Sequence, residues 1–186
     1  MKLLKDIDCT ILKDKRVYKR PSSRGIILKD DKILLLYIKK HDDYSFPGGG
    51  LEKDETPREG LIREIQEETG ANNIKIISNY GIYNEIIPPL KRKEIDYIYM
   101  TSYFFICSVD SNLGKPQLED YEEEMGIKAL WINIHDAVAH NKKVQKEKPI
   151  YMSRYLEREL FILELVAEEL EKNTDINFRN YMIDFY

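Results

Sequence analysis

The sequence predicts an α/β protein in which a mixed β-sheet is sandwiched between helices. Segments rich in β-branched and aromatic residues alternate with amphipathic helical segments, a pattern typical of that class. The segment 95–109 is apolar on both faces, as expected of a central strand covered from both sides. With 186 residues, 42% of them hydrophobic, the chain can bury a sizeable core. We expect one domain over residues 1–186, with an N-terminal strand (about 1–20) and a C-terminal helix and tail (about 151–186) as appendages.

Strands are assigned from alternating or continuous apolar runs, and helices from apolar residues that recur every three to four positions. Asp30 and Asp31 separate two of the strands and predict a hairpin turn. The predicted strands are 7–11, 24–29, 33–38, 74–87, 95–109 and 130–134. Three helices are predicted: one that begins after residue 56, one that begins near residue 136, and one over residues 151–172. Residues 119–124 are expected to be a loop.

The helix that follows Thr56 has local signals at both ends. Thr56 is a good N-cap residue, Pro57 occupies the first helical position, and Glu59 completes a capping box. Gly70 stands where a left-handed residue commonly ends a helix. These signals predict a helix bounded by Thr56 and Gly70.

Glu64, Glu67 and Glu68 share one face of this helix, because they lie three and four residues apart. Like charges at this spacing destabilise a helix unless a cation offsets them. A solvated charged face is the ordinary interpretation of such a cluster. Here, however, the cluster is in register with a glycine-rich entry, a cap and a glycine exit, which favours a site for a hard divalent cation such as Mg²⁺.

The segment 49–71 reads GGLEKDETPREGLIREIQEETGA and resembles the signature of the Nudix hydrolase superfamily (MutT-like). That signature is G-x5-E-x7-R-E-U-x-E-E-x-G-U, where U is a bulky aliphatic residue, and the chain matches every position but the last. There Ala71 replaces the larger residue, a departure that affects packing more than chemistry. The flanks are also similar to that family, since Arg24 opens a strand, Phe46 and Pro47 precede the glycines, and Trp131 lies in a later strand.

The resemblance implies an α/β/α fold and a metal site built on this helix. Mg²⁺ is the implied cofactor, with Mn²⁺ as a substitute. The implied metal ligands are the Gly48 carbonyl, Glu64, Glu67 and Glu68. The implied substrate contacts are Arg24, Gly49 and Glu55. Arg63 would orient the glutamates by salt bridges, and Glu67 or Glu68 would also take a proton from water.

Many members of the family place a further carboxylate before a later strand, where it acts as general base. In this chain Glu119, Glu122, Glu123 and Glu124 all precede Trp131. We favour Glu122 or Glu124 for this catalytic role. A string of acidic residues is also typical of a solvated loop, and the sequence does not decide between these two glutamates.

The resemblance implies hydrolysis of a nucleoside diphosphate linked to a moiety X, giving a nucleoside monophosphate and phosphorylated X. The alternative is a Nudix domain that senses a nucleotide without cutting it. The filled acidic positions favour the enzyme, and so does the lack of a winged-helix segment after residue 135. A diphosphate isomerase would need a thiol near the substrate, and Cys107 is poorly placed for that role because it ends a strand.

Composition limits the partners and the compartment. A net charge of −4 and a pI near 5.5 provide no bulk electrostatic reason to bind nucleic acid. Two cysteines are too few for a disulfide framework, and charges interrupt the first residues where a signal peptide would be apolar. No apolar stretch approaches bilayer length. We expect a cytoplasmic protein with a small nucleotide-derived substrate, no membrane partner, and the possibility of a homodimer through its N-terminal strand or C-terminal tail.

Overall fold

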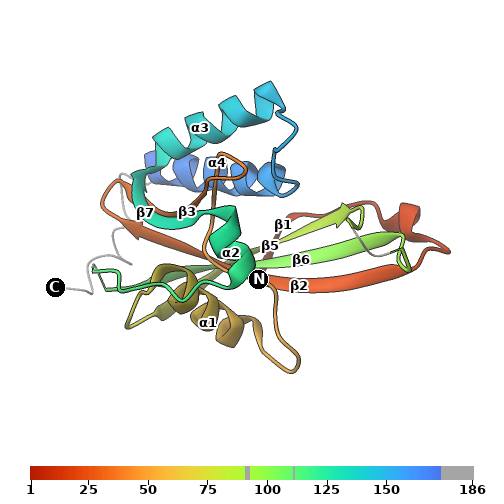
Figure 1. Ribbon diagram of the computed structural model, residues 1–186, viewed down its shortest axis with the longest axis horizontal. Helices are drawn as coiled ribbons and strands as arrows, with labels where there is room; N and C mark the ends of the chain where they lie inside the picture. Colours follow the sequence, from red (N-terminus) through yellow and green to blue (C-terminus); the bar gives the residue numbers. More distant parts are fainter. Residues whose placement is uncertain (91–92, 111, 173–186) are drawn as a thin grey trace.

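The computed structural model describes residues 1–90, 93–110 and 112–172 (Figure 1). Seven strands form one sheet in the order β1-β5-β6-β2-β3-β4, and β7 pairs with β3. The strands are β1 (Lys2–Lys5), β2 (Val17–Lys29), β3 (Lys32–Ile38), β4 (Asp43–Ser45), β5 (Lys75–Ile87), β6 (Tyr97–Ser108) and β7 (Ile127–Asn133). The helices are a 3₁₀ turn η1 (Cys9–Leu12), α1 (Pro57–Thr69), α2 (Asp120–Met125), α3 (Ile134–Glu147) and α4 (Leu156–Lys172).

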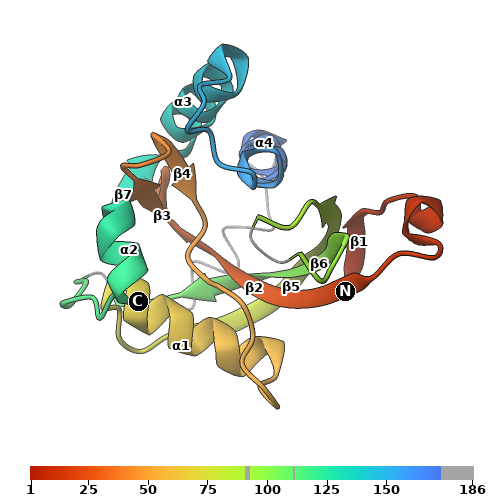
Figure 2. The same ribbon diagram turned by 45° about the vertical axis from the view of Figure 1, so that its right-hand side comes forward.

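The sheet separates two hydrophobic cores. Figure 2 shows α1 on one side of the sheet and the α3–α4 pair on the other. Strand β6 lies between β5 and β2, and its successive side chains serve both cores. Phe104 packs in the core under α4, and Phe105 packs in the core under α1. The predicted α/β/α sandwich and the central position of the segment 95–109 are therefore confirmed.

The predicted hairpin of β2 and β3 is also confirmed. Leu28 pairs with Ile33, and Asp30 adopts a positive φ of 55° in the turn between them. Strand β2 begins earlier than expected, at Val17, because its first half pairs in parallel with β6. Only the last two residues of β2 pair with β3, so no strand among the described residues pairs with the other edge of its middle part.

A loop occupies that free edge of β2 and brings the glycine-rich segment to the sheet. The amide of Ser23 donates to the Gly49 carbonyl at 3.0 Å, and the amide of Gly25 donates to the Pro47 carbonyl at 2.9 Å. In the other direction, the amide of Leu51 donates to the Pro21 carbonyl of β2 at 3.2 Å. These bonds hold the residues that precede α1 against β2.

Helix α1 has the predicted ends. Thr56 Oγ1 accepts from the Glu59 amide at 3.3 Å, and Glu59 Oε2 accepts from the Thr56 amide at 2.9 Å, so both halves of the capping box are present. Gly70 ends the helix in the left-handed region at φ 66°. A side chain there would also overlap the backbone of Gly114, so glycine is required twice over at this position.

Three local predictions were wrong. Residues 7–11 were expected to form a strand, but the strand at this end is β1, further upstream, and η1 follows it. The Asp8 side chain accepts from the Thr10 amide and turns the chain there. The expected acidic loop 119–124 contains helix α2. The predicted C-terminal helix begins at Leu156 rather than at residue 151. The tail 173–186, suggested as a dimer contact, lies outside the described residues.

In the described part of the chain, none of the helices is both long enough and apolar enough to cross a bilayer.

Candidate active site

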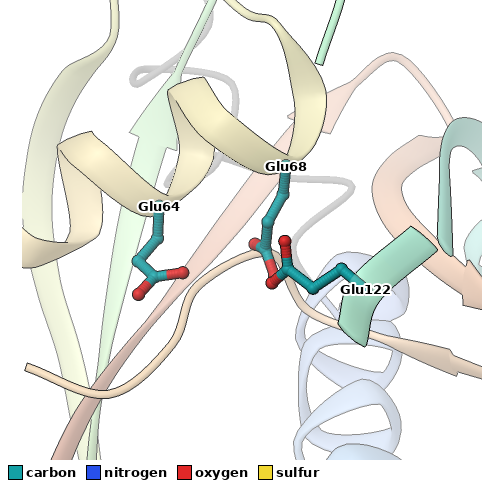
Figure 3. A group of neighbouring side chains, drawn as sticks. All are labelled: Glu64, Glu68 and Glu122. Carbon is teal, nitrogen blue, oxygen red and sulfur yellow. The ribbon is translucent and has the colours of Figure 1, made fainter. Parts of the chain in front are cut away.

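Three carboxylates from two helices meet at one point. Glu64 and Glu68 project from α1 and Glu122 projects from α2, as Figure 3 shows. One ligand atom of each lies within 4.8 Å of the other two. Glu68 and Glu122 are almost fully buried, with exposed fractions of 6% and 5%. This group, called the carboxylate cluster below, joins two segments more than fifty residues apart in sequence.

Burial and mutual repulsion disfavour the charged forms of the carboxylates in this cluster. Burial raises the pKa of Glu68 well above its ordinary value, although the positive charge of Arg24 opposes this effect. Burial also raises the pKa of Glu64, against the influence of Arg63. A bound divalent cation would offset this crowding of negative charge, and carboxylate oxygens are the ligands that Mg²⁺ and Mn²⁺ prefer. The donor set therefore fits such an ion.

Helix α2 fixes the position of Glu122. The hydroxyl of Tyr121 donates to Glu122 Oε1 at 3.0 Å, and the amide of Glu119 donates to Glu122 Oε2 at 2.9 Å. Gly126 ends the helix in the left-handed region at φ 70°. Glu124, the other glutamate favoured from the sequence, is exposed and takes no part in the carboxylate cluster.

Arg63 lies at the centre of the ion pairs on α1. Its guanidinium reaches Glu55 at 3.0 Å, Glu64 at 3.0 Å and Glu67 at 2.9 Å, and it donates to the Gly50 carbonyl at 3.3 Å. The hydrogen bond with Glu55 raises the pKa of Arg63 and lowers the pKa of Glu55. Glu67 thus turns toward Arg63 and stays outside the carboxylate cluster, with its side chain 40% exposed.

Glycines allow the loop before α1 to approach these carboxylates. The amide of Gly48 donates to Glu68 Oε2 at 2.6 Å. A side chain on Gly49 would overlap the carboxylate of Glu64. Gly48 has a φ of 129°, and a side chain there would overlap the Ser23 carbonyl. The loop can therefore lie directly against the cluster.

Comparisons with known proteins agree with this geometry. The family model that describes the NUDIX domain matches residues 19–153. The chain belongs to the Nudix family.

Two relatives of this chain are phosphohydrolases. The chain is 29% identical over 117 residues to an RNA pyrophosphohydrolase of Nitratiruptor sp., an alignment that covers 55% of this chain and 76% of that protein. It is 30% identical over 133 residues to the diphosphoinositol polyphosphate phosphohydrolase NUDT4B of Homo sapiens, covering 70% of this chain and 63% of that one. The reaction class shared by the family and these relatives is hydrolysis of a pyrophosphate linkage, and this Nudix protein is an enzyme of that class.

The fold is also similar to that of a solved relative. The structure of a NUDIX hydrolase from Nitrosomonas europaea matches with a TM-score of 0.53 at 23% identity, covering 67% of this chain and 78% of that one. The likeness supports the α/β Nudix architecture described above.

Arg24 lies beside the carboxylate cluster of the Nudix helix α1. Its Nη1 donates to the Ser23 carbonyl at 3.1 Å, whereas its buried Nε has no hydrogen-bond partner among the described residues. Burial lowers the pKa of Arg24, and the nearby charges of Glu68 and Glu64 oppose that effect. A guanidinium beside the carboxylate cluster is suited to hold a phosphate oxygen.

Sequence reasoning missed Tyr121, whose hydroxyl contacts Glu122, and Glu159 of α4, which contacts the loop before the glycines. The signals for α2 were present in the sequence: Glu119 and Glu122 have capping-box spacing, and Gly126 follows at the right distance for a C-cap. For Glu159 we find no local signal, because its partners come from distant segments.

Asp43 provides a pH-dependent contribution to the stability of this Nudix protein. It opens β4 with an exposed fraction of 2%, and its Oδ1 has no hydrogen-bond partner in the described part of the chain. Burial, followed by the charges of Glu159 and Asp42, raises the pKa of Asp43 from 3.8 to about 7. The folded protein therefore keeps a proton that the unfolded chain releases. This contribution is complete below the unfolded pKa and is lost as the pH rises through the folded pKa.

Asp43→Asn should remove this dependence. We expect the free energy of unfolding of the parent, relative to Asp43→Asn, to fall by a few kcal/mol between about pH 4 and pH 8, since one pKa unit corresponds to about 1.4 kcal/mol. Urea denaturation of both proteins across that range measures the difference. A difference that stays constant with pH would contradict the assignment.

Proposed function

We propose that this Nudix enzyme hydrolyses the pyrophosphate bond of a nucleoside diphosphate linked to a moiety X in a reaction that requires Mg²⁺. Water adds across the P–O–P link, and the products are a nucleoside monophosphate and phosphorylated X. The observation that carries the proposal is the carboxylate cluster, in which ligand atoms of three glutamates lie within 4.8 Å of one another beside a glycine-rich loop.

The metal would be held by the carboxylate cluster, with the Gly48 carbonyl as a further ligand; Glu67, expected as a ligand from the sequence, would act through its ion pair with Arg63. When bound, the ion neutralises phosphate oxygens and lowers the pKa of a coordinated water. Glu68 is kept in place by the Gly48 amide, and Glu64 by Arg63. Mn²⁺ is the expected substitute because it accepts the same oxygen ligands.

The remaining side chains bind and orient. Glu122 is the candidate proton acceptor, because the Tyr121 hydroxyl and a backbone amide hold its carboxylate within the cluster. Arg24 is the candidate contact for a phosphate oxygen, because its positive charge lies near Glu64 and Glu68. Gly49 leaves room for the Glu64 carboxylate and would meet the substrate as part of the glycine-rich loop, and Glu55 keeps Arg63 aligned with the cluster.

The rest of the proposal concerns organisation and setting. The chain acts as one Nudix domain on a small nucleotide-derived substrate, in the cytoplasm and without a nucleic-acid or membrane partner; a homodimer is compatible with it. A reducing compartment suits its cysteines, since Cys9 is exposed and Cys107 is buried, both as free thiols.

The test is hydrolysis by the purified protein with Mg²⁺, with products identified by mass spectrometry. The panel contains ADP-ribose, a nucleotide sugar, a dinucleoside polyphosphate and an oxidised nucleoside triphosphate. The names of the relatives add an RNA with a 5′-triphosphate and a diphosphoinositol polyphosphate. Release of a nucleoside monophosphate that stops when EDTA is added supports the proposal. Hydrolysis confined to diphosphoinositol would contradict the nucleotide assignment, and turnover that is unaffected by EDTA would contradict the metal requirement.

A further inference from the structure

Helix α4 carries a pair of charged residues into the protein interior. Arg158 and Glu159 have exposed fractions of 0% and 2%. Arg158 donates to Glu159 Oε1 through Nη2 at 2.6 Å and through Nε at 3.1 Å. Its Nη1 also donates to Glu85 at 2.6 Å and to Ser102 at 3.2 Å. Buried charges are costly unless they are paired and hydrogen-bonded, so these partners hold the pair in one arrangement.

The second oxygen of Glu159 binds the loop that leads to the glycines. The amide of Phe46 donates to Glu159 Oε2 at 3.0 Å. Because Phe46 is fully buried, this amide would have no water to replace the carboxylate. A hydrogen bond to a carboxylate is also stronger than one between neutral groups. Since Arg158 holds the other oxygen, the carboxylate is aimed at the loop.

Two residues later the same loop reaches the carboxylate cluster. The carbonyl of Pro47 accepts from the Gly25 amide at 2.9 Å, and the amide of Gly48 donates to Glu68 at 2.6 Å. The proline restricts the backbone between Phe46 and Gly48. Phe46 is the upstream anchor of this short segment, so the loss of its bond to Glu159 would loosen the support of the Gly48 amide that donates to Glu68.

We propose that Glu159, aligned by Arg158, is a positioning residue that holds the segment 46–48 in the geometry required for metal binding and hydrolysis. The inference rests on the proposed function, because it concerns the same site. Arg24 lies within reach of both groups of charges: burial and then Arg158 lower its pKa, whereas Glu159, Glu68 and Glu64 raise it. The buried pair on α4 and the carboxylate cluster are thus connected through the loop 46–48.

The test uses two substitutions that remove different parts of the contact. Glu159→Gln keeps an acceptor for the Phe46 amide and loses the charge that faces Arg158, whereas Glu159→Ala loses both. We expect kcat to fall about tenfold in the first and about a hundredfold in the second, with smaller changes in KM, because both losses act on geometry rather than on substrate contacts. The dissociation constant for Mn²⁺, followed by electron paramagnetic resonance of the free ion, should rise about tenfold in Glu159→Ala.

Leu163→Ala is the matched control. Leu163 lies one turn further along α4, is fully buried, and packs in the core without a polar contact to the loop. Its truncation should lower the thermal unfolding midpoint while kcat and the Mn²⁺ dissociation constant of the folded protein stay at the parent values. All measurements are made at a temperature at which circular dichroism shows each variant to be folded. If the Glu159 variants lost activity only because the fold is less stable, Leu163→Ala would lose kcat and Mn²⁺ affinity as well.

The outcomes for this inference and for the proposed function are separable. If the parent hydrolyses its substrate and both Glu159 variants match it in kcat and in Mn²⁺ affinity, the positioning role is wrong and the function stands. If the parent hydrolyses nothing, the proposed function fails, and the Mn²⁺ titrations still decide whether Glu159 controls the site. Should Glu159→Ala fail to fold, a parent-like Glu159→Gln in both measurements overturns the inference.

Discussion

Glu68→Gln should lower kcat by at least about a hundredfold without unfolding the protein, as expected for loss of a metal ligand. The substitution preserves the shape of the side chain and an acceptor oxygen for the Gly48 amide, which donates to Glu68 at 2.6 Å. It removes only the negative charge that Glu68 adds to the carboxylate cluster. Because burial raises the pKa of this carboxyl, the neutral amide should fit the metal-free protein at least as well. Activity and stability should therefore change in opposite directions.

The measurements are kcat at saturating Mg²⁺ and the thermal unfolding midpoint in EDTA. Glu67→Gln should cost less, about tenfold, since Glu67 contacts Arg63 and lies outside the carboxylate cluster. Glu59→Gln is the matched control on the same helix, because glutamine also completes a capping box, and its kcat should equal that of the parent. A parent-like kcat for Glu68→Gln, or an equal loss for Glu59→Gln, would remove the metal role from this position.

The helix that carries this prediction could be recognised from sequence because its signals are local. Thr56, Glu59 and Gly70 lie within the helix or next to it, and each acts on the backbone of its own neighbours. The same holds for the β2–β3 hairpin, whose turn residue Asp30 adopts a positive φ between two strands that are adjacent in the chain. Such elements require little information from the rest of the molecule.

Distant contacts explain what the sequence did not reveal. Helix α2 has six residues and an acidic composition that resembles a solvated loop, and the burial of Glu122 depends on how α2 packs near α1. Arg158 and Glu159 belong to an amphipathic helix, where charged residues usually face water. They are buried because Glu85 and the loop at Phe46, both far away in sequence, provide their partners. Contacts between distant segments, rather than residue type, determine whether these side chains are buried.

Placement within the fold also separates the two glutamates that the sequence favoured equally. Glu122→Gln should lower kcat by about a hundredfold, because it removes the charge of a carboxylate that lies within 4.8 Å of ligand atoms of Glu64 and Glu68. Glu124→Gln should leave kcat close to the parent value, because that side chain is exposed on the same short helix and outside the cluster. The two substitutions make the same chemical change two residues apart. Steady-state kinetics on the best substrate, with both variants at the same Mg²⁺ concentration, compares them directly.

Tyr121→Phe refines the role of Glu122. The phenol donates to Glu122 Oε1 at 3.0 Å. Without it, the Glu119 amide should still hold Oε2, but the carboxylate could rotate about that single hydrogen bond. We expect a loss in kcat of about tenfold, between those of the two glutamine variants. If Glu124→Gln were instead the inactive variant and Glu122→Gln the active one, α2 would have to present its opposite face to α1 during the reaction. The order of the three activities thus tests whether the orientation of α2 seen here is the one in which the enzyme works.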